Sequence, residues 1–152
     1  MTHWLRQLAL ALFALVAVNA CGQAPKSTVT IRDAWASATP AGATVGAAYL
    51  ELTVAEQDTL LSAISPVADR IEMHASSEEN GMMKMRPLPT VALQPGKPFA
   101  FSPGGAHFML LGLREPLAAG TRFPLTLQLQ NAGTLAVQVE VKALIDSNPG
   151  RH

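Results

Sequence analysis

The chain has 152 residues, which is enough for one domain whose core can fold without disulfide bonds. Its 11 basic and 11 acidic residues balance, so the composition gives no indication of a nucleic-acid partner or another polyanion. The single cysteine excludes an internal disulfide, and it lies ahead of the predicted fold, so it offers no thiolate to a metal there.

The first twenty residues have the features of a secretory signal peptide. A short basic start precedes an apolar run over residues 8–18 that is too short to span a membrane. Cys21 follows directly, and the sequence V-N-A-C that ends there resembles a bacterial lipobox, with an unusual Asn. We therefore expect a signal peptide over residues 1–20, acylation of Cys21 and a tether over residues 22–27. This predicts a periplasmic lipoprotein anchored to a membrane; plain secretion with an incidental cysteine is the alternative.

From residue 28 onward, short segments alternate apolar and polar residues and are separated by Gly, Pro, Asn and Asp. The predicted strands cover residues 28–35, 47–54, 59–65, 70–75, 82–86, 90–93, 98–101, 107–113, 123–130 and 134–141. Residues 131–133 are typical of a hairpin turn, whereas the polar residues 76–81 predict a loop. We expect one all-β domain over residues 28–145, an antiparallel sandwich or barrel, followed by a tail over residues 146–152.

Two histidines and five of the six methionines gather between Glu72 and Leu113, and the sixth methionine is the initiator. Imidazole and thioether are the groups that a soft, monovalent copper ion prefers. Strand alternation predicts that Met73 packs inward while His74 lies outward or at the rim. It also places His107 and Met109 together on one face, so a single strand could present both to one metal ion.

The run Met82-Met83-Lys84-Met85 leaves two interpretations open. In a regular strand Met83 and Met85 share one face and Met82 lies on the other, so at least one methionine faces solvent. Methionine is also a common gap-filler in protein cores, and for any one of these residues packing is the more common role.

The spacing of four residues is more specific than their clustering. Ten residues separate His74 from Met85, twenty-one separate Met85 from His107, and one separates His107 from Met109. This resembles the pattern H-x10-M-x21-H-x-M of the periplasmic copper chaperones called the PCu(A)C family. The similarity spans residues 29–141 and includes the segments N-G-M-M-K-M-R-P, G-G-A-H-F-M-L-L-G-L-R-E-P-L and G-T-R-F-P-L-T-L.

The resemblance implies a cupredoxin-like antiparallel Greek-key β-sandwich and one Cu(I) site made by His74, Met85, His107 and Met109. It also implies delivery of copper to cytochrome c oxidase, through its copper-bearing subunit or a thiol copper-assembly protein. Family members often carry Glu directly after the first histidine, and Ala75 stands there, which puts a supporting role of that residue in doubt. The chain ends D-S-N-P-G-R-H without a His- and Met-rich tail, so we predict no second copper site. We expect a monomer.

Three functions follow from these observations: a copper chaperone, a copper-buffering or resistance protein with the same site, and a metal-free β-sandwich interaction module whose methionines pack. The sequence has no Ser-His-Asp arrangement, phosphate loop or zinc spacing that would support an enzyme. We expect Met73 to pack or to lie beside the site. Met82 and Met83 should pack or lie exposed at the surface, with auxiliary thioethers as the alternative, and Trp35 and Tyr49 should be core aromatic residues.

Overall fold

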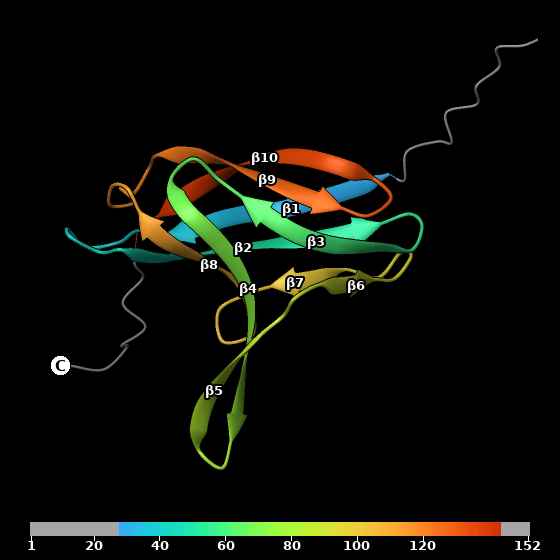
Figure 1. Ribbon diagram of the computed structural model, residues 1–152, viewed down its shortest axis with the longest axis horizontal. Helices are drawn as coiled ribbons and strands as arrows, with labels where there is room; N and C mark the ends of the chain where they lie inside the picture. Colours follow the sequence, from blue (N-terminus) through green and yellow to red (C-terminus); the bar gives the residue numbers. More distant parts are fainter. Residues whose placement is uncertain (1–27, 144–152) are drawn as a thin grey trace, which may run out of the picture.

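The computed structural model describes residues 28–143, which form ten β-strands (Figure 1). In chain order they are β1 (Val29–Ser37), β2 (Val45–Val54), β3 (Asp58–Ile64), β4 (Ala68–Glu79), β5 (Met82–Pro87), β6 (Val91–Leu93), β7 (Phe99–Phe101), β8 (Ala106–Leu113), β9 (Arg122–Leu129) and β10 (Gly133–Lys142). The predicted signal peptide, Cys21 and the tail lie outside the described residues, so the domain limits stay predictions.

The ten strands form one hydrogen-bonded sheet in the order β5-β4-β8-β7-β2-β1-β10-β9-β3-β6, and β8 also pairs with β2. The pairings β1–β10 and β7–β8 are parallel, and the others are antiparallel. β3 contacts β4 although the two strands lie far apart in this order, so the sheet folds back on itself as two layers. Figure 1 shows β9, β10, β1 and β3 above and β8, β7 and β6 below. The predicted all-β sandwich is confirmed.

The space between the layers is filled because the strands alternate buried and exposed side chains. β2 shows the period of two most clearly, with every second residue from Gly46 to Val54 buried. The largest fully buried side chains are Phe108, Leu50, Leu52, Leu60, Leu93, Leu110, Leu125, Leu127, Leu129, Val54, Val139 and Val141.

The β4–β5 hairpin projects from the sandwich as an arm (Figure 1). The prediction of a loop over residues 76–81 is wrong here, because β4 continues to Glu79 and only Asn80 and Gly81 form the turn. Both turn residues have positive φ, 55° and 74°, which is the conformation that a two-residue Asn-Gly hairpin turn requires. Polarity alone was misleading because the end of β4 is a strand exposed to solvent.

Trp35 and Tyr49 are not core residues, which corrects the prediction for them. They are cross-strand partners on β1 and β2 and only half-buried, and their rings contact each other at a tilt of 39° with centroids 4.6 Å apart. Their neighbours Ala36 and Ala48 are fully buried, so the two aromatic rings lie on the outer face. The ammonium of Lys142 lies 5.4 Å from the centre of the Trp35 ring.

The predicted turn between β9 and β10 is confirmed, and the carboxylate of Asp58 ties it to β3. Asp58 is 2% exposed and accepts backbone hydrogen bonds from Thr59 at 2.7 Å, Asn131 at 2.9 Å and Ala132 at 2.8 Å. Burial alone would raise the pKa of Asp58, but the backbone N–H groups outweigh it and hold that pKa below its ordinary value.

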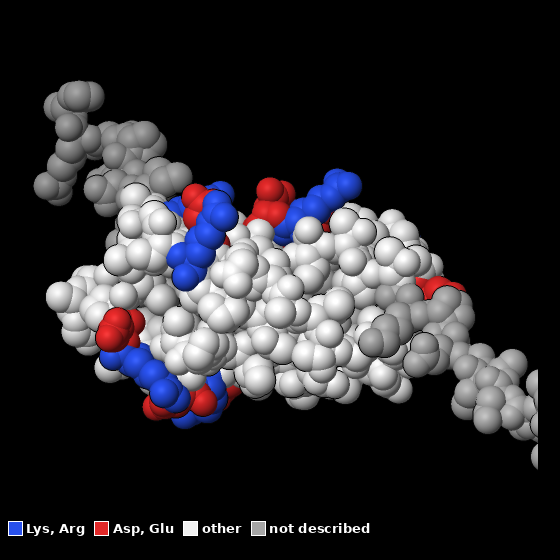
Figure 2. All heavy atoms as spheres, turned by 90° about the horizontal axis from the view of Figure 1, so that it is seen from above, with Lys and Arg blue, Asp and Glu red and all other residues white. Residues whose placement is uncertain are grey.

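Charged side chains of both signs lie next to one another on the face that Figure 2 shows. The ion pairs include Arg122 with Glu140 at 3.5 Å and Lys84 with Glu79 at 2.6 Å. None of the residues from 28 to 143 belongs to a helix that is long and apolar enough to cross a membrane.

Candidate metal centre

The two histidines of the motif lie opposite each other on neighbouring strands. β4 pairs with β5 on one side and with β8 on the other, and the register places His74 directly across from His107. Their ring centroids are 5.9 Å apart, and the rings are nearly perpendicular, at 82°. Side chains of directly paired residues lie on the same face of a sheet, so both imidazoles share one surface.

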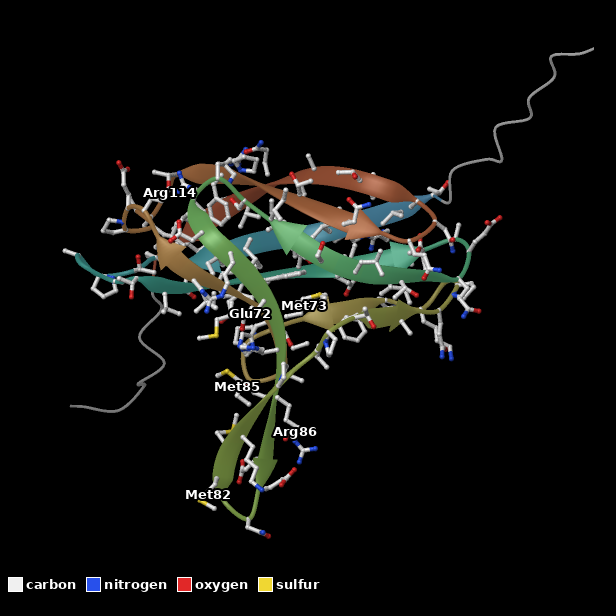
Figure 3. The ribbon with its side chains drawn as sticks, in the orientation of Figure 1. Glu72, Met73, Met82, Met85, Arg86 and Arg114 are labelled. Carbon is white, nitrogen blue, oxygen red and sulfur yellow. The ribbon has the colours of Figure 1, made fainter. Side chains whose placement is uncertain are left out.

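The same register places both predicted methionines on that surface. Met109 is paired with Glu72, two residues from His74 along β4, and Met85 is paired with Ser76, two residues from His74 in the other direction. The four residues thus belong to one face of three adjacent strands, with the histidines between the methionines. Figure 3 shows Met85 where the arm leaves the body and Met82 towards its tip.

Burial separates the members of this face. His107 is 9% exposed and the side chain of His74 is 13% exposed, whereas Met85 is 55% exposed. Met73 is 6% exposed and belongs to the core, so its predicted packing role is confirmed. Met82 is 63% exposed and Met83 is 61% exposed on the arm, so of the roles left open for these two methionines the structure excludes packing and shows surface exposure.

A stack of phenylalanine rings supports β8 beneath the histidines. Phe108 is fully buried and lies against Phe101 with ring centroids 4.1 Å apart, and Phe101 in turn contacts Phe99 at 5.1 Å. Because Phe108 stands between His107 and Met109 in sequence, its packing fixes the backbone from which both project.

The ring of His107 is oriented by a backbone carbonyl. Its Nδ1 lies 3.1 Å from the carbonyl oxygen of Gly105. A carbonyl oxygen only accepts, so this contact assigns the proton to Nδ1 and leaves Nε2 with a free lone pair.

The ring of His74 is oriented by Glu72, on the same face of β4. Nε2 of His74 lies 3.2 Å from Oε2 of Glu72, while Oε1 of Glu72 accepts from Nε of Arg70 at 2.9 Å. The hydrogen bond from Arg70, together with the charge of Arg70 and the contact with His74, holds the pKa of Glu72 below its ordinary value, although desolvation acts to raise it. A carboxylate accepts the proton of Nε2, so Nδ1 of His74 carries the lone pair.

Nδ1 of His74 is buried and has no hydrogen-bond partner within the described part of the chain. A buried polar atom left unpaired costs about 1–3 kcal/mol, so such atoms usually have a function or a missing partner. This nitrogen, the free nitrogen of His107 and the sulfur atoms of Met85 and Met109 form a neutral set of two imidazoles and two thioethers. Such a set could hold a soft, monovalent cation. No group of three or more His, Cys, Asp or Glu side chains suited to a metal ion occurs in residues 28–143.

Two supporting groups, Glu72 and the carbonyl of Gly105, were not predicted from the sequence. A backbone carbonyl has no signature in the sequence. The i, i+2 spacing of Glu72 and His74 in a strand places both on one face, and this was the available signal for Glu72. Ala75, which follows His74 directly, lies on the other face of β4.

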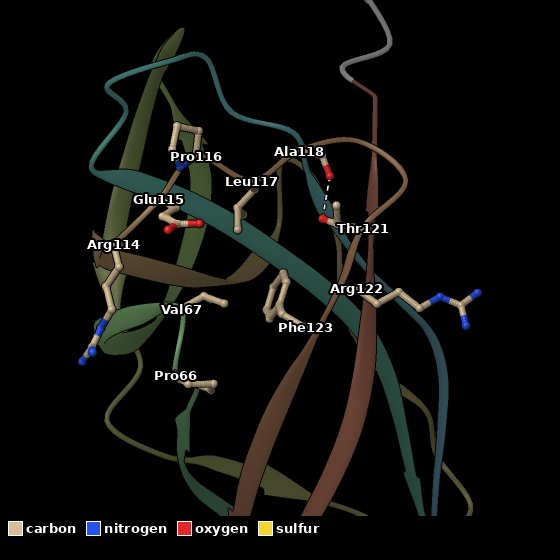
Figure 4. Close-up of a pocket in the computed structure, with 10 residues that line it drawn as sticks. All are labelled: Pro66, Val67, Arg114, Glu115, Pro116, Leu117, Ala118, Thr121, Arg122 and Phe123. Atoms are coloured by element: carbon tan, nitrogen blue, oxygen red, sulfur yellow. Dashed lines mark hydrogen bonds between the residues drawn. The ribbon is translucent and has the colours of Figure 1, made fainter.

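A pocket lies at the far end of β8 from the histidines. It has a volume of about 470 Å³ and is lined by the connection between β3 and β4, by the segment that follows β8 and by the start of β9 (Figure 4). Inside this segment the hydroxyl of Thr121 donates to the carbonyl of Ala118 at 2.7 Å. The two arginines at the pocket already face carboxylates, Arg114 at 3.8 Å from Asp69 and Arg122 at 3.5 Å from Glu140.

Comparison with known proteins places the chain in a family. The family model described as "LpqE-like: Putative lipoprotein LpqE-like" matches residues 29–141. The protein named "Putative lipoprotein Lxx21020" from Leifsonia xyli subsp. xyli (strain CTCB07) is 29% identical over 121 residues, which cover 79% of this chain and 73% of that protein.

Solved structures share the fold. The solution structure of CuI-DR1885 from Deinococcus radiodurans is 26% identical with a TM-score of 0.61, and the match covers 85% of this chain and 87% of that one. The copper-bound PCuAC domain from PmoF2 is 20% identical with a TM-score of 0.64, over 76% of this chain and 92% of that one. The predicted cupredoxin-like sandwich and the kinship with PCu(A)C proteins are confirmed: the chain belongs to the LpqE-like family and has the fold of a PCuAC domain.

Proposed function

We propose that this protein is a periplasmic copper chaperone that carries one Cu(I) ion as cargo. The ligands are Nδ1 of His74, Nε2 of His107 and the sulfur atoms of Met85 and Met109. The observation that carries the proposal is the buried, unpaired Nδ1 of His74, which lies beside His107 on the face that both methionines share.

The donor set favours a carrier over an electron-transfer centre or an enzyme. Blue-copper sites place a cysteine thiolate on the metal, and this face offers only neutral imidazole and thioether groups. Neutral ligands leave the ion its single positive charge, and one of them, Met85, is 55% exposed. Copper can therefore be taken up and handed on by ligand exchange without a change of oxidation state.

The relatives support this proposal. The PCuAC domain from PmoF2 was solved with copper bound, and DR1885 was solved with Cu(I). The family and its relative from Leifsonia xyli carry the name lipoprotein, which supports acylation of Cys21 and a place outside the cytoplasm. We propose that the recipient is cytochrome c oxidase, through its copper-bearing subunit or a thiol copper-assembly protein.

A competition titration with a Cu(I) chelator under anaerobic conditions tests the site. The double variant His107→Ala/Met109→Ala removes two ligands, and its affinity should fall by more than the roughly 10- to 100-fold that loss of an outer partner costs. Met82→Leu, a change of an exposed methionine on the opposite face, is the control and should bind like the wild type. Unchanged affinity in the double variant would show that the ligands are assigned wrongly.

Two further measurements separate the competing functions. Elemental analysis after copper loading should find one copper per chain, and no bound copper would favour the metal-free interaction module. Deletion of the gene at limiting copper should lower cytochrome c oxidase activity, whereas unchanged activity would favour copper buffering with the same site.

A further inference from the structure

The arm carries two different faces beyond the proposed site. Cross-strand pairs place Met83 opposite Glu78 and Met85 opposite Ser76, and both pairs belong to the face of His74.

The opposite face of the arm carries charged side chains that form ion pairs with one another. Glu79 contacts Nζ of Lys84 at 2.6 Å and the guanidinium of Arg86 at 2.5 Å. Met82 is the cross-strand partner of Glu79 and shares this charged face. The thioethers of Met82 and Met83 therefore point to different sides of one strand, although both are about equally exposed.

The exposure of Met83 excludes a packing role and leaves its thioether available to a ligand. Met83 is 61% exposed and two residues from Met85, a distance of about 7 Å along a strand. Its direct partner Glu78 adds a carboxylate on the same face, which attracts a cation. On this face Met83 lies nearer to the tip of the arm than Met85, which is the outermost of the four proposed ligands.

We propose that Met83 is a docking thioether where Cu(I) first binds before it passes to Met85 and the histidines. This inference rests on the proposed function and adds an outer binding step to it. A bond from copper to its donor ligand breaks as the bond to the sulfur of Met83 forms. That bond then breaks as the bond to Met85 forms. Copper stays monovalent throughout, and a thioether binds no proton, so neither an electron nor a proton moves.

The pair of variants Met83→Leu and Met82→Leu tests this step, because both remove an exposed thioether from the same strand. Transfer of Cu(I) from its bicinchoninate complex to the full chain is followed by stopped-flow absorbance under anaerobic conditions. Met83→Leu should load more slowly, on the order of tenfold, while its equilibrium affinity stays that of the wild type. Met82→Leu should load at the wild-type rate.

Three results would overturn the inference. The first is loading of Met83→Leu at the wild-type rate. The second is equally slow loading of Met82→Leu, which would indicate a general effect of the arm. The third is a loss of equilibrium affinity in Met83→Leu as large as that in Met85→Leu, which would make Met83 a resident ligand. Each of these leaves the proposed function intact, whereas a wild-type chain that takes up no Cu(I) would refute the proposed function as well.

Discussion

Glu72 should control how well the proposed site holds copper, because its carboxylate is what orients the ring of His74. Oε2 of Glu72 lies 3.2 Å from Nε2 of His74. Replacement of Glu72 by Ala therefore removes the acceptor that keeps the proton on Nε2 and leaves the lone pair of Nδ1 available to the metal. Loss of such a partner typically costs about 10- to 100-fold in metal affinity. The Glu72 side chain is 41% exposed, and its carboxylate also contacts Arg70, so solvent screens its interaction with His74. We therefore expect a loss of affinity at the low end of this range, about tenfold.

Competition with a Cu(I) chelator measures this affinity for three variants. Glu72→Gln keeps a carbonyl oxygen that can accept from Nε2, and it should retain most of the wild-type affinity, unlike Glu72→Ala. Glu115→Ala removes an exposed carboxylate beyond the other end of β8 and controls for net charge. A second readout needs no copper: the Nε2–H signal of His74 in an NMR spectrum should be protected from exchange with water in the wild type and broadened in Glu72→Ala.

The reasoning is refuted if Glu72→Ala binds Cu(I) like the wild type and keeps the protected Nε2–H signal. An equal loss of affinity in Glu115→Ala would instead assign the effect to overall charge. A lost NMR signal with unchanged affinity would show that Glu72 orients the ring but that the ring orientation does not limit binding.

Two predictions concern stability. Asp58→Asn should lower the free energy of unfolding by about 2–3 kcal/mol in a denaturant titration at pH 7, because hydrogen bonds to a charged acceptor are worth roughly 1.5–3 kcal/mol. Its folded-state pKa is lowered, so the wild type should lose this contribution as the pH falls below about 4, and an equal loss in the Asn variant would contradict this assignment. Gly112→Ala should destabilise more than Gly120→Ala in thermal melts. Both glycines have positive φ, 68° and 83°, but only at Gly112 would a Cβ meet Asp69, at 2.4 Å from Oδ2 and 2.9 Å from its Cβ; equal melting temperatures would show that Asp69 moves aside.

Much of the site could be predicted because strand parity is a local property. Alternation along β4 separated Met73 from His74, and alternation along β8 kept His107 and Met109 together; the burial of Met73 agrees with this. The pairing of His74 with His107 is not local, since it depends on the register between β4 and β8. The spacing of the motif could suggest that pairing only through resemblance to a family.

The errors share a physical cause, which is that hydrophobicity reports burial and not strand structure. The end of β4 was predicted as a loop because its residues are polar, but a projecting hairpin has two exposed faces and needs no apolar one. Its Asn80-Gly81 turn was the signal for the hairpin, and it outweighs the polarity before it. For Trp35 and Tyr49 the error was the opposite one: burial was predicted, but two aromatic rings that contact each other can lie on an outer face.

On the proposed function, the two halves of the site are held differently, and this explains how one site can both retain and release an ion. His74 and His107 are nearly buried, and each ring has one nitrogen engaged by the protein. Met85 belongs to the exposed arm, and its flexible, uncharged side chain is oriented by no comparable contact in the described residues. An incoming ligand would therefore displace Met85 first while the imidazoles still hold the ion. A protein that receives copper must then approach β5 and the face of the arm that bears Met83, and not the pocket at the far end of β8.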